Sequence, residues 1–91
     1  MRLDLFLKAS RLVLRRTVAQ QLCDANRVEI SGVVAKSSRA VKVGDEITVR
    51  RADRVLTVRV LTVPATKQTS RADASNLYEI IQDTPIADEW A

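Results

Sequence analysis

The sequence of 91 residues contains no histidine and only one cysteine, Cys23. With a single cysteine, the chain cannot form an internal disulfide or a zinc site made of several cysteines. Without histidine, it lacks the side chain that most often transfers protons near neutral pH and most often binds metals. These absences argue against an enzyme, and we expect neither a metal nor any other cofactor.

Aromatic residues and long apolar runs are also scarce. The aromatic residues are Phe6, Tyr78 and Trp90, so the chain lacks the row of exposed rings on which single-stranded RNA readers stack bases. Charged residues interrupt the N-terminal segment MRLDLFLKASRLV, which therefore does not resemble a signal peptide, and no segment approaches the length of a membrane span. We expect a cytoplasmic protein that does not associate with a membrane.

Positive charge is distributed unevenly along the chain. The formal net charge is +4, but residues 1–42 carry nine Lys or Arg against three Asp or Glu. Residues 72–91 carry five acids and no base. A basic body with an acidic end is typical of nucleic-acid binding proteins whose acidic segment stays outside the contact. The sequence therefore predicts that the first half of the chain binds nucleic acid.

Two helices are predicted near the N-terminus. Leu and Phe residues recur at one-turn spacing and predict a first helix over about residues 3–14. Thr17 and Gln20 match a capping box, in which each side chain bonds to the other residue's backbone amide, so a second helix is predicted over about residues 17–25. Asn26 follows and tolerates the left-handed conformation that commonly ends a helix. Because these residues suffice to define the second helix, its flanking arginines are expected to have no structural role.

After the second helix, the apolar period changes from 3.6 to 2. Val28 and Ile30 alternate with polar residues, and Ile47 and Val49 do so after a Gly-Asp turn, which predicts two strands. The longest β-rich run covers residues 55–63. We therefore expect an α+β fold with two N-terminal helices packed on a small, mostly antiparallel sheet.

The C-terminal third is less regular. Residues 65–76 predict a polar loop, and residues 77–83 are compatible with either a strand or a helical turn. The end of the chain, TPIADEWA, predicts a mobile tail. We expect residues 1–64 to form the RNA-binding domain with its sheet, and residues 65–91 to add the loop, a short last element and the acidic tail.

Basic residues of the helical half fall close together in the predicted structure. Lys8, Arg11 and Arg15 have the spacing of one helical face if the first helix extends that far. Arg16 lies beside the N-terminal amides of the second helix, which attract phosphate. A merely soluble surface normally mixes charges of both signs. The cluster therefore predicts contacts to the phosphates and sugars of a structured RNA, which is recognised by its shape and backbone.

The acidic residues and the cysteine have simpler interpretations. Asp4 lies in the first turn of the first helix, where it favours the helix dipole and could hold Arg2 or Lys8 in place. Residues 45–46, Asp-Glu, follow a glycine in a hairpin turn and point in different directions, so they do not form a catalytic pair. Cys23 lies on the apolar side of the second helix and is expected in the core.

The segment from Arg2 to Val49 resembles the S-four RNA-binding domain, the αL motif shared by a small-subunit ribosomal protein, tyrosyl-tRNA synthetases and pseudouridine synthases. The resemblance covers about half of the chain. Its anchors are Arg2-Leu3-Asp4, Arg15-Arg16-Thr17, Arg27-Val28, Ser31-Gly32, Lys36-Ser37 and Val43-Gly44-Asp45. Leu5 replaces a residue that is often basic in the family, and Asn26 replaces a common glycine.

Within this superfamily, the chain looks most like stand-alone proteins of ribosome-associated quality control. The resemblance implies a monomer without enzymatic activity that binds 23S rRNA and peptidyl-tRNA on the obstructed large subunit, while a partner protein adds alanines to the stalled chain. Arg2 and Arg16 are the first candidates for RNA contact. The surrounding surface is expected to comprise Lys8, Arg11, Arg15, Arg27, Lys36, Ser37 and Arg39.

Other functions remain open from the sequence. One is a heat-shock-type factor that recycles large subunits, and another is an adaptor for tRNA or another structured RNA. An enzyme or an enzyme's appended targeting domain would need a catalytic sequence, which the chain does not contain.

Overall fold

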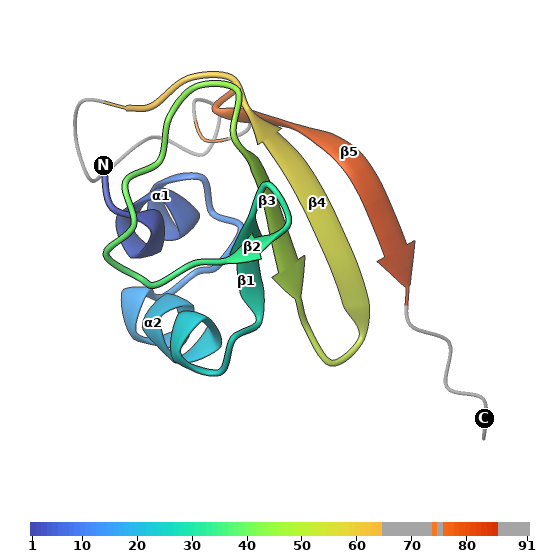
Figure 1. Cartoon of the computed structure of the whole chain (residues 1–91). Coiled ribbons are helices and arrows are strands. Elements are labelled where there is room, and N and C mark those ends of the chain that lie inside the picture. Colours follow the sequence, from blue (N-terminus) through green and yellow to red (C-terminus); the bar gives the residue numbers. More distant parts are fainter. Residues whose placement is uncertain (65–73, 75, 86–91) are drawn as a thin grey trace.

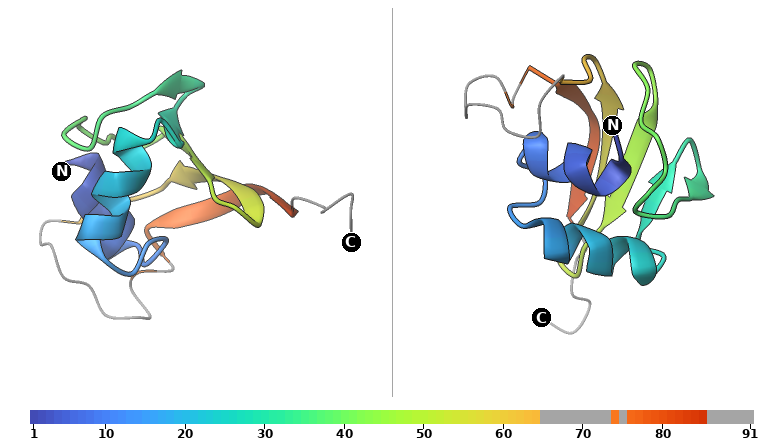
Figure 2. Two further views of the ribbon diagram at one scale, coloured as in Figure 1. Left: turned by 90° about the horizontal axis from the view of Figure 1, so that it is seen from below. Right: turned by 90° about the vertical axis from the view of Figure 1, so that its left-hand side faces the viewer.

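The computed structural model describes residues 1–64, 74 and 76–85. Its elements are α1 (Leu3–Ala9), α2 (Arg16–Asp24), β1 (Val28–Ile30), β2 (Val33–Val34), β3 (Glu46–Arg50), β4 (Arg54–Val60) and β5 (Tyr78–Pro85). The strands form one antiparallel sheet in the order β2-β1-β3-β4-β5. Both helices lie on the same face of this sheet (Figures 1 and 2). The predicted α+β fold is confirmed.

The core lies between the helices and the covered face of the sheet. Leu3, Phe6 and Leu7 of α1 are completely buried, and burying a side chain of this size contributes about 1.5–3 kcal/mol. They belong to one apolar cluster with alternate residues of the sheet. Those residues are Val28, Ile30, Ile47, Val49, Val58 and Val60. The period-2 pattern therefore identified the inward-facing residues of β1 and β3 correctly.

The first helix is shorter than the sequence predicts. It ends at Ala9, and Arg11 adopts a left-handed conformation with a φ of 59°. The chain then turns back so that Val13 is buried, and the Val13 amide donates to the Leu7 carbonyl at 3.1 Å. The predicted extension to about residue 14 is wrong, since the chain leaves the helix after Ala9 and reaches the core again at Val13.

The second helix begins one residue earlier than predicted and is capped differently. Arg15 is its N-cap residue, and no side chain caps the first turn. Gln20 instead donates its side-chain amide to Asp4, so the predicted capping box is wrong. The C-terminal end is as predicted, because Asn26 has a φ of 60°. The Asn26 and Arg27 amides donate to the last turn in a Schellman motif.

The turn at Gly44 and the last strand complete the sheet. Gly44 has a φ of 92°, and the Asp45 carboxylate accepts a bond from the Lys42 amide at 2.9 Å, so the turn before β3 is as predicted. Residues 77–83, for which the sequence left a strand or a helical turn open, lie mostly in the strand β5. This strand pairs with β4 along its length and contains a bulge opposite residues 57–58. The predicted polar loop lies mostly outside the described residues, as does most of the predicted tail, including Trp90. No described helix is long and apolar enough to span a membrane.

Candidate nucleic-acid interface

A buried carboxylate joins the two helices. The Asp4 side chain is completely buried, and its two oxygens lie 3.3 Å from the Arg2 Nε and 3.2 Å from the Arg16 Nε. The Gln20 side-chain amide and the Leu5 backbone amide also donate to Asp4, at 3.0 Å and 2.9 Å. We call Asp4, Arg2 and Arg16 the Asp4 cluster. It brings together two arginines that are far apart in sequence.

The ionised form of Asp4 is favoured in the folded protein. Burial by itself would raise the pKa of this carboxyl group. The hydrogen bonds from Gln20 and Arg16, the positive charge of Arg2 and the Leu5 amide outweigh that effect and hold the Asp4 pKa below its ordinary value. Asp4 is therefore a charged group at neutral pH, with basic and amide donors around it.

The geometry of the Asp4 cluster leaves much of each guanidinium available. Both arginines approach Asp4 through Nε, and their side chains are 45% and 40% exposed. A guanidinium has five N–H donors, of which four belong to the terminal nitrogens. The cluster therefore presents two fixed cationic groups that can each bind a phosphate through two parallel hydrogen bonds. The expectation that the arginines flanking the second helix have no structural role is wrong for Arg16, because Arg16 helps to compensate a buried charge.

The expected role of Asp4 is confirmed in part. It lies in the first turn of α1 and pairs with Arg2. Among the described residues, its other ion pair is with Arg16 rather than with Lys8. The sequence separation of Asp4 and Arg16 gave no local signal for this contact, which depends on the antiparallel packing of the two helices (Figure 2).

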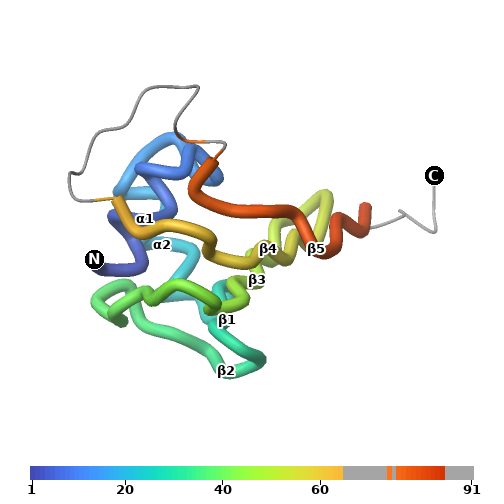
Figure 3. Tube along the Cα trace, turned by 90° about the horizontal axis from the view of Figure 1, so that it is seen from above, coloured from blue at the N-terminus to red at the C-terminus, as the bar shows by residue number. Residues whose placement is uncertain are grey.

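A turn from the middle of the chain adds further predicted residues to this surface. The carbonyls of Arg39 and Ser37 accept bonds from the first two amides of α1, at 2.8 Å and 3.1 Å. Figure 3 shows this green segment passing beside the N-terminal end of the chain. Arg39 and Lys36 are exposed, and Ser37 is half-buried. The structure therefore places Lys36, Ser37 and Arg39 next to Arg2.

The remaining predicted bases lie in different places. Lys8, Arg11 and Arg15 are all exposed, but they do not share a helical face, because α1 ends before Arg11 and Arg15 caps α2. They surround the α1–α2 connection, which we define as residues 10–15. Arg27 is exposed and lies past the C-terminal end of α2. This end is about 13 Å along the helix axis from the start of α2, at a rise of about 1.5 Å per residue. The structure does not bring Arg27 to the Asp4 cluster.

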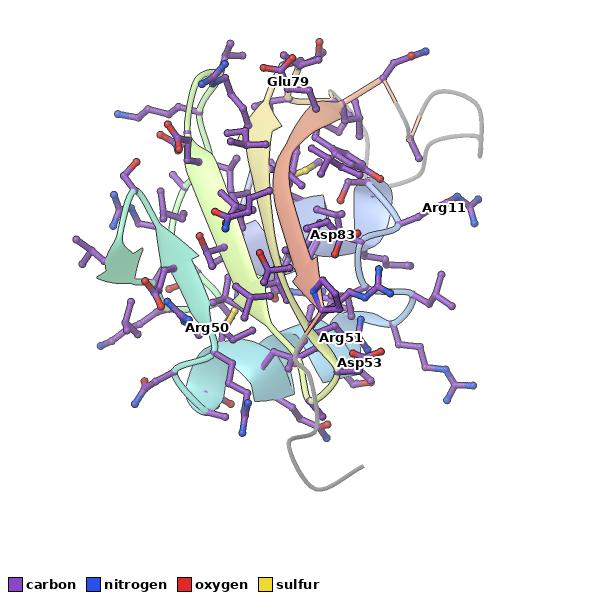
Figure 4. The ribbon with its side chains drawn as sticks, turned by 90° about the vertical axis from the view of Figure 1, so that its right-hand side faces the viewer. Arg11, Arg50, Arg51, Asp53, Glu79 and Asp83 are labelled. Carbon is purple, nitrogen blue, oxygen red and sulfur yellow. The ribbon has the colours of Figure 1, made fainter. Side chains whose placement is uncertain are left out.

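Bases on the sheet have acidic partners on neighbouring strands. Figure 4 shows this side of the molecule, with Arg50, Glu79 and Asp83 labelled. The ion pairs are Arg50–Glu29 at 2.7 Å, Arg54–Asp83 at 3.1 Å and Arg59–Glu79 at 2.8 Å. Two acids of the predicted acidic end thus belong to β5 and neutralise arginines of β4. The strand register produces these pairs, which the charge distribution along the sequence did not reveal.

Cys23 is a core residue, as predicted. Its side chain is buried, and burial together with the negative charges of Asp4 and Asp24 raises the thiol pKa to about 11. Within the described part of the chain, no group of three or more His, Cys, Asp or Glu residues could hold a metal ion.

Comparisons with known proteins identify similar sequences and structures. The S4 domain family model matches residues 1–47. The RQC P-site tRNA stabilizing factor of Bacillus subtilis is 43% identical over 97% of this chain and 100% of its own length. The protein of the same name from Streptococcus pneumoniae is 42% identical over 94% and 96%.

Two solved structures have the same fold over most of the chain. The trimeric Heat Shock Protein 15 of Vibrio cholerae superposes with a TM-score of 0.80 at 28% identity, covering 88% of this chain and 80% of that protein. The solution structure of the hypothetical protein HP1423 has a TM-score of 0.74 at 35% identity, covering 98% and 100%.

Proposed function

The chain belongs to the S4 domain family, and from this premise we propose that it is a non-enzymatic RNA-binding protein of ribosome-associated quality control that stabilises P-site tRNA. The relatives named for this role align with it over nearly their whole length. The structural observation that carries the proposal is the Asp4 cluster, in which Arg2 and Arg16 are fixed by a buried carboxylate and remain half-exposed. Two fixed guanidinium groups suit the backbone of a structured RNA.

The proposed RNA surface centres on the Asp4 cluster and extends in two directions. Lys36, Ser37 and Arg39 border Arg2 on one side, and the bases around the α1–α2 connection border Arg16 on the other. We propose 23S rRNA of the obstructed large subunit and its peptidyl-tRNA as the ligands, with an alanine-tailing protein as the partner. If about six bases bind phosphates, the logarithm of the association constant should fall with the logarithm of salt concentration with a slope of about −4 to −5.

Sedimentation of cell extracts tests the proposal. Under translational stalling, the wild-type chain should sediment with free large subunits, and Arg16→Gln should move most of the protein to the top of the gradient. Arg59→Gln provides a control that removes the same charge from the open face of the sheet, where Arg59 is already paired with Glu79. If the wild-type protein stayed at the top of the gradient during stalling, the ribosomal assignment would be wrong.

A second candidate function is recycling of large subunits in the manner of a heat-shock factor. The similarity to Heat Shock Protein 15 of Vibrio cholerae favours this alternative. Both functions use binding to large subunits, so the distinguishing measurement is the tail on stalled nascent chains. Deletion of the gene should abolish alanine tails under the first proposal and leave them unchanged under the second.

A further inference from the structure

The β3–β4 hairpin carries four arginines, of which one differs from the others in its surroundings. Arg50, Arg54 and Arg59 each pair with a carboxylate of a neighbouring strand, at distances between 2.7 Å and 3.1 Å. Arg51 is exposed at the tip of the hairpin. Among the described residues, no carboxylate lies within ion-pair distance of it. Its positive charge is therefore not offset in the way that the other three are.

Arg51 also has a defined place relative to the helical half. Its Nη1 donates to the Leu12 carbonyl at 3.4 Å, and Leu12 belongs to the α1–α2 connection. This contact ties the tip of the hairpin to the basic segment that contains Arg11 and ends at Arg15. Figure 4 shows Arg51 at the lower end of the sheet and Arg11 projecting from the connection beyond β5. Arg50 and Glu79 lie apart from them in the same view.

We propose that Arg51 extends the RNA-binding surface from the α1–α2 connection onto the β3–β4 hairpin, where it binds a backbone phosphate of the same structured RNA. This inference rests on the proposed function. A base that already has a carboxylate partner neutralises less of the RNA charge, and so releases fewer counterions on binding. The ion pairs of the sheet therefore lower the charge that Arg50, Arg54 and Arg59 can offer to RNA, and Arg51 is the hairpin arginine best suited to continue the interface.

Asp53 provides a test of the sign of this effect. It is exposed at the same hairpin tip as Arg51, and Figure 4 shows both residues at that end. A phosphate close enough to be attracted by Arg51 is also repelled by Asp53, because the two charges act over similar distances. Neutralising the two residues should therefore change RNA affinity in opposite directions.

The experiment measures binding of the full chain to a tRNA transcript and to purified large subunits between 50 and 200 mM potassium chloride, concentrations of the order at which phosphate contacts dominate affinity. Arg51→Gln should weaken binding roughly fivefold near physiological salt and reduce the magnitude of the salt slope by about 0.7–0.9, as expected for one lost phosphate contact. Arg51→Lys should retain the wild-type slope. Asp53→Asn should tighten binding by roughly twofold, as expected for removal of one nearby like charge at high dielectric.

Arg59→Gln is the control matched in net charge, and circular dichroism verifies the fold of each variant. Binding by Arg59→Gln should keep the wild-type slope. If Arg51→Gln kept the wild-type affinity and slope, or if Arg59→Gln weakened binding as much, the proposed role of Arg51 would be overturned. Arg16→Gln separates this outcome from failure of the proposed function. If Arg16→Gln loses binding and Arg51→Gln does not, the proposed RNA-binding function is supported and the role of Arg51 is rejected. If the wild-type chain shows no salt-dependent binding, both the function and the role of Arg51 are rejected.

Discussion

Replacement of Asp4 by Asn distinguishes a positioning role from simple charge counting. The change removes a negative charge from a protein whose proposed ligand is a polyanion, so charge counting predicts tighter RNA binding. The structure predicts the opposite. Arg2 and Arg16 bind different oxygens of Asp4 through their Nε atoms, and an Asn side chain replaces one of those oxygens with an NH2 group that cannot accept. We therefore expect Asp4→Asn to weaken RNA binding.

The exposure of Arg2 and Arg16 determines how much stability and RNA affinity Asp4→Asn should lose. Removing one member of a fully buried pair costs 3–5 kcal/mol, but Arg2 and Arg16 are half-exposed and can be rehydrated. The loss of charge-assisted hydrogen bonds should then lower the free energy of unfolding by about 2–3 kcal/mol. For a chain of this length, the melting temperature should fall by roughly 10–20 °C. Ordering two released arginines on binding costs about 1–3 kcal/mol, which corresponds to a roughly 5- to 150-fold loss of affinity.

Filter binding at fixed salt, well below the melting temperature of the variant, provides the assay. Asp24→Asn is the matched control, because Asp24 is an exposed acid at the last residue of α2 and has no ion-pair partner among the described residues. It should bind RNA as tightly as the wild-type chain or slightly more tightly. If folded Asp4→Asn also bound more tightly, Asp4 would act only as a charge, and the positioning argument would be refuted.

Four further predictions concern stability and reactivity. Because folding lowers the pKa of Asp4, the contribution of the Asp4 carboxylate to stability is complete above about pH 4 and is lost as the pH falls through the pKa of the folded state. Urea unfolding from pH 7 to pH 2 should show this loss in the wild-type chain and not in Asp4→Asn. Cys23, with its thiol pKa near 11, should react with iodoacetamide at neutral pH only as fast as the protein unfolds, measured by mass spectrometry with and without urea. Asn26→Ala should lose about 1 kcal/mol by chemical denaturation, because Ala disfavours the left-handed conformation, whereas Asn26→Gly should not. Phe6→Ala should cost about 3–5 kcal/mol in the same assay, and a smaller loss would mean that the core collapses around the cavity.

Local sequence rules predicted the fold wherever local preference and core packing agree. The left-handed conformation of Asn26 and the alternate burial along β1 and β3 are such cases. The capping box failed because Gln20 has a stronger alternative partner. A buried carboxylate without donors is more costly than a helix end exposed to water, so the Gln20 amide is used at Asp4. That competition depends on the packing of α1 against α2 and has no local signature.

The sequence indicated candidate residues for the site, but it did not predict how they are arranged in space. The clustered bases and the resemblance to the S-four domain identified Arg2 and Arg16 as candidates. The contact that joins them crosses two helices, whose relative position the spacing of apolar residues does not define. The predicted helical face of Lys8, Arg11 and Arg15 failed because α1 ends at Ala9 and Arg11 adopts a left-handed conformation.

The placement of the carboxylates, more than the number of bases, distinguishes the proposed RNA-binding face from the sheet face. On the sheet, acids of adjacent strands lie beside Arg50, Arg54 and Arg59 and offset their charge; two of these acids, Asp83 and Glu79, are exposed, and Glu29 is half-buried. On the helical side, the acid that contacts arginines is buried beneath them. A carboxylate below two guanidinium groups fixes their orientation while leaving their outer donors toward solvent. Under the proposed function, the same pairing of arginine with carboxylate therefore makes the helical side better suited to RNA than the sheet.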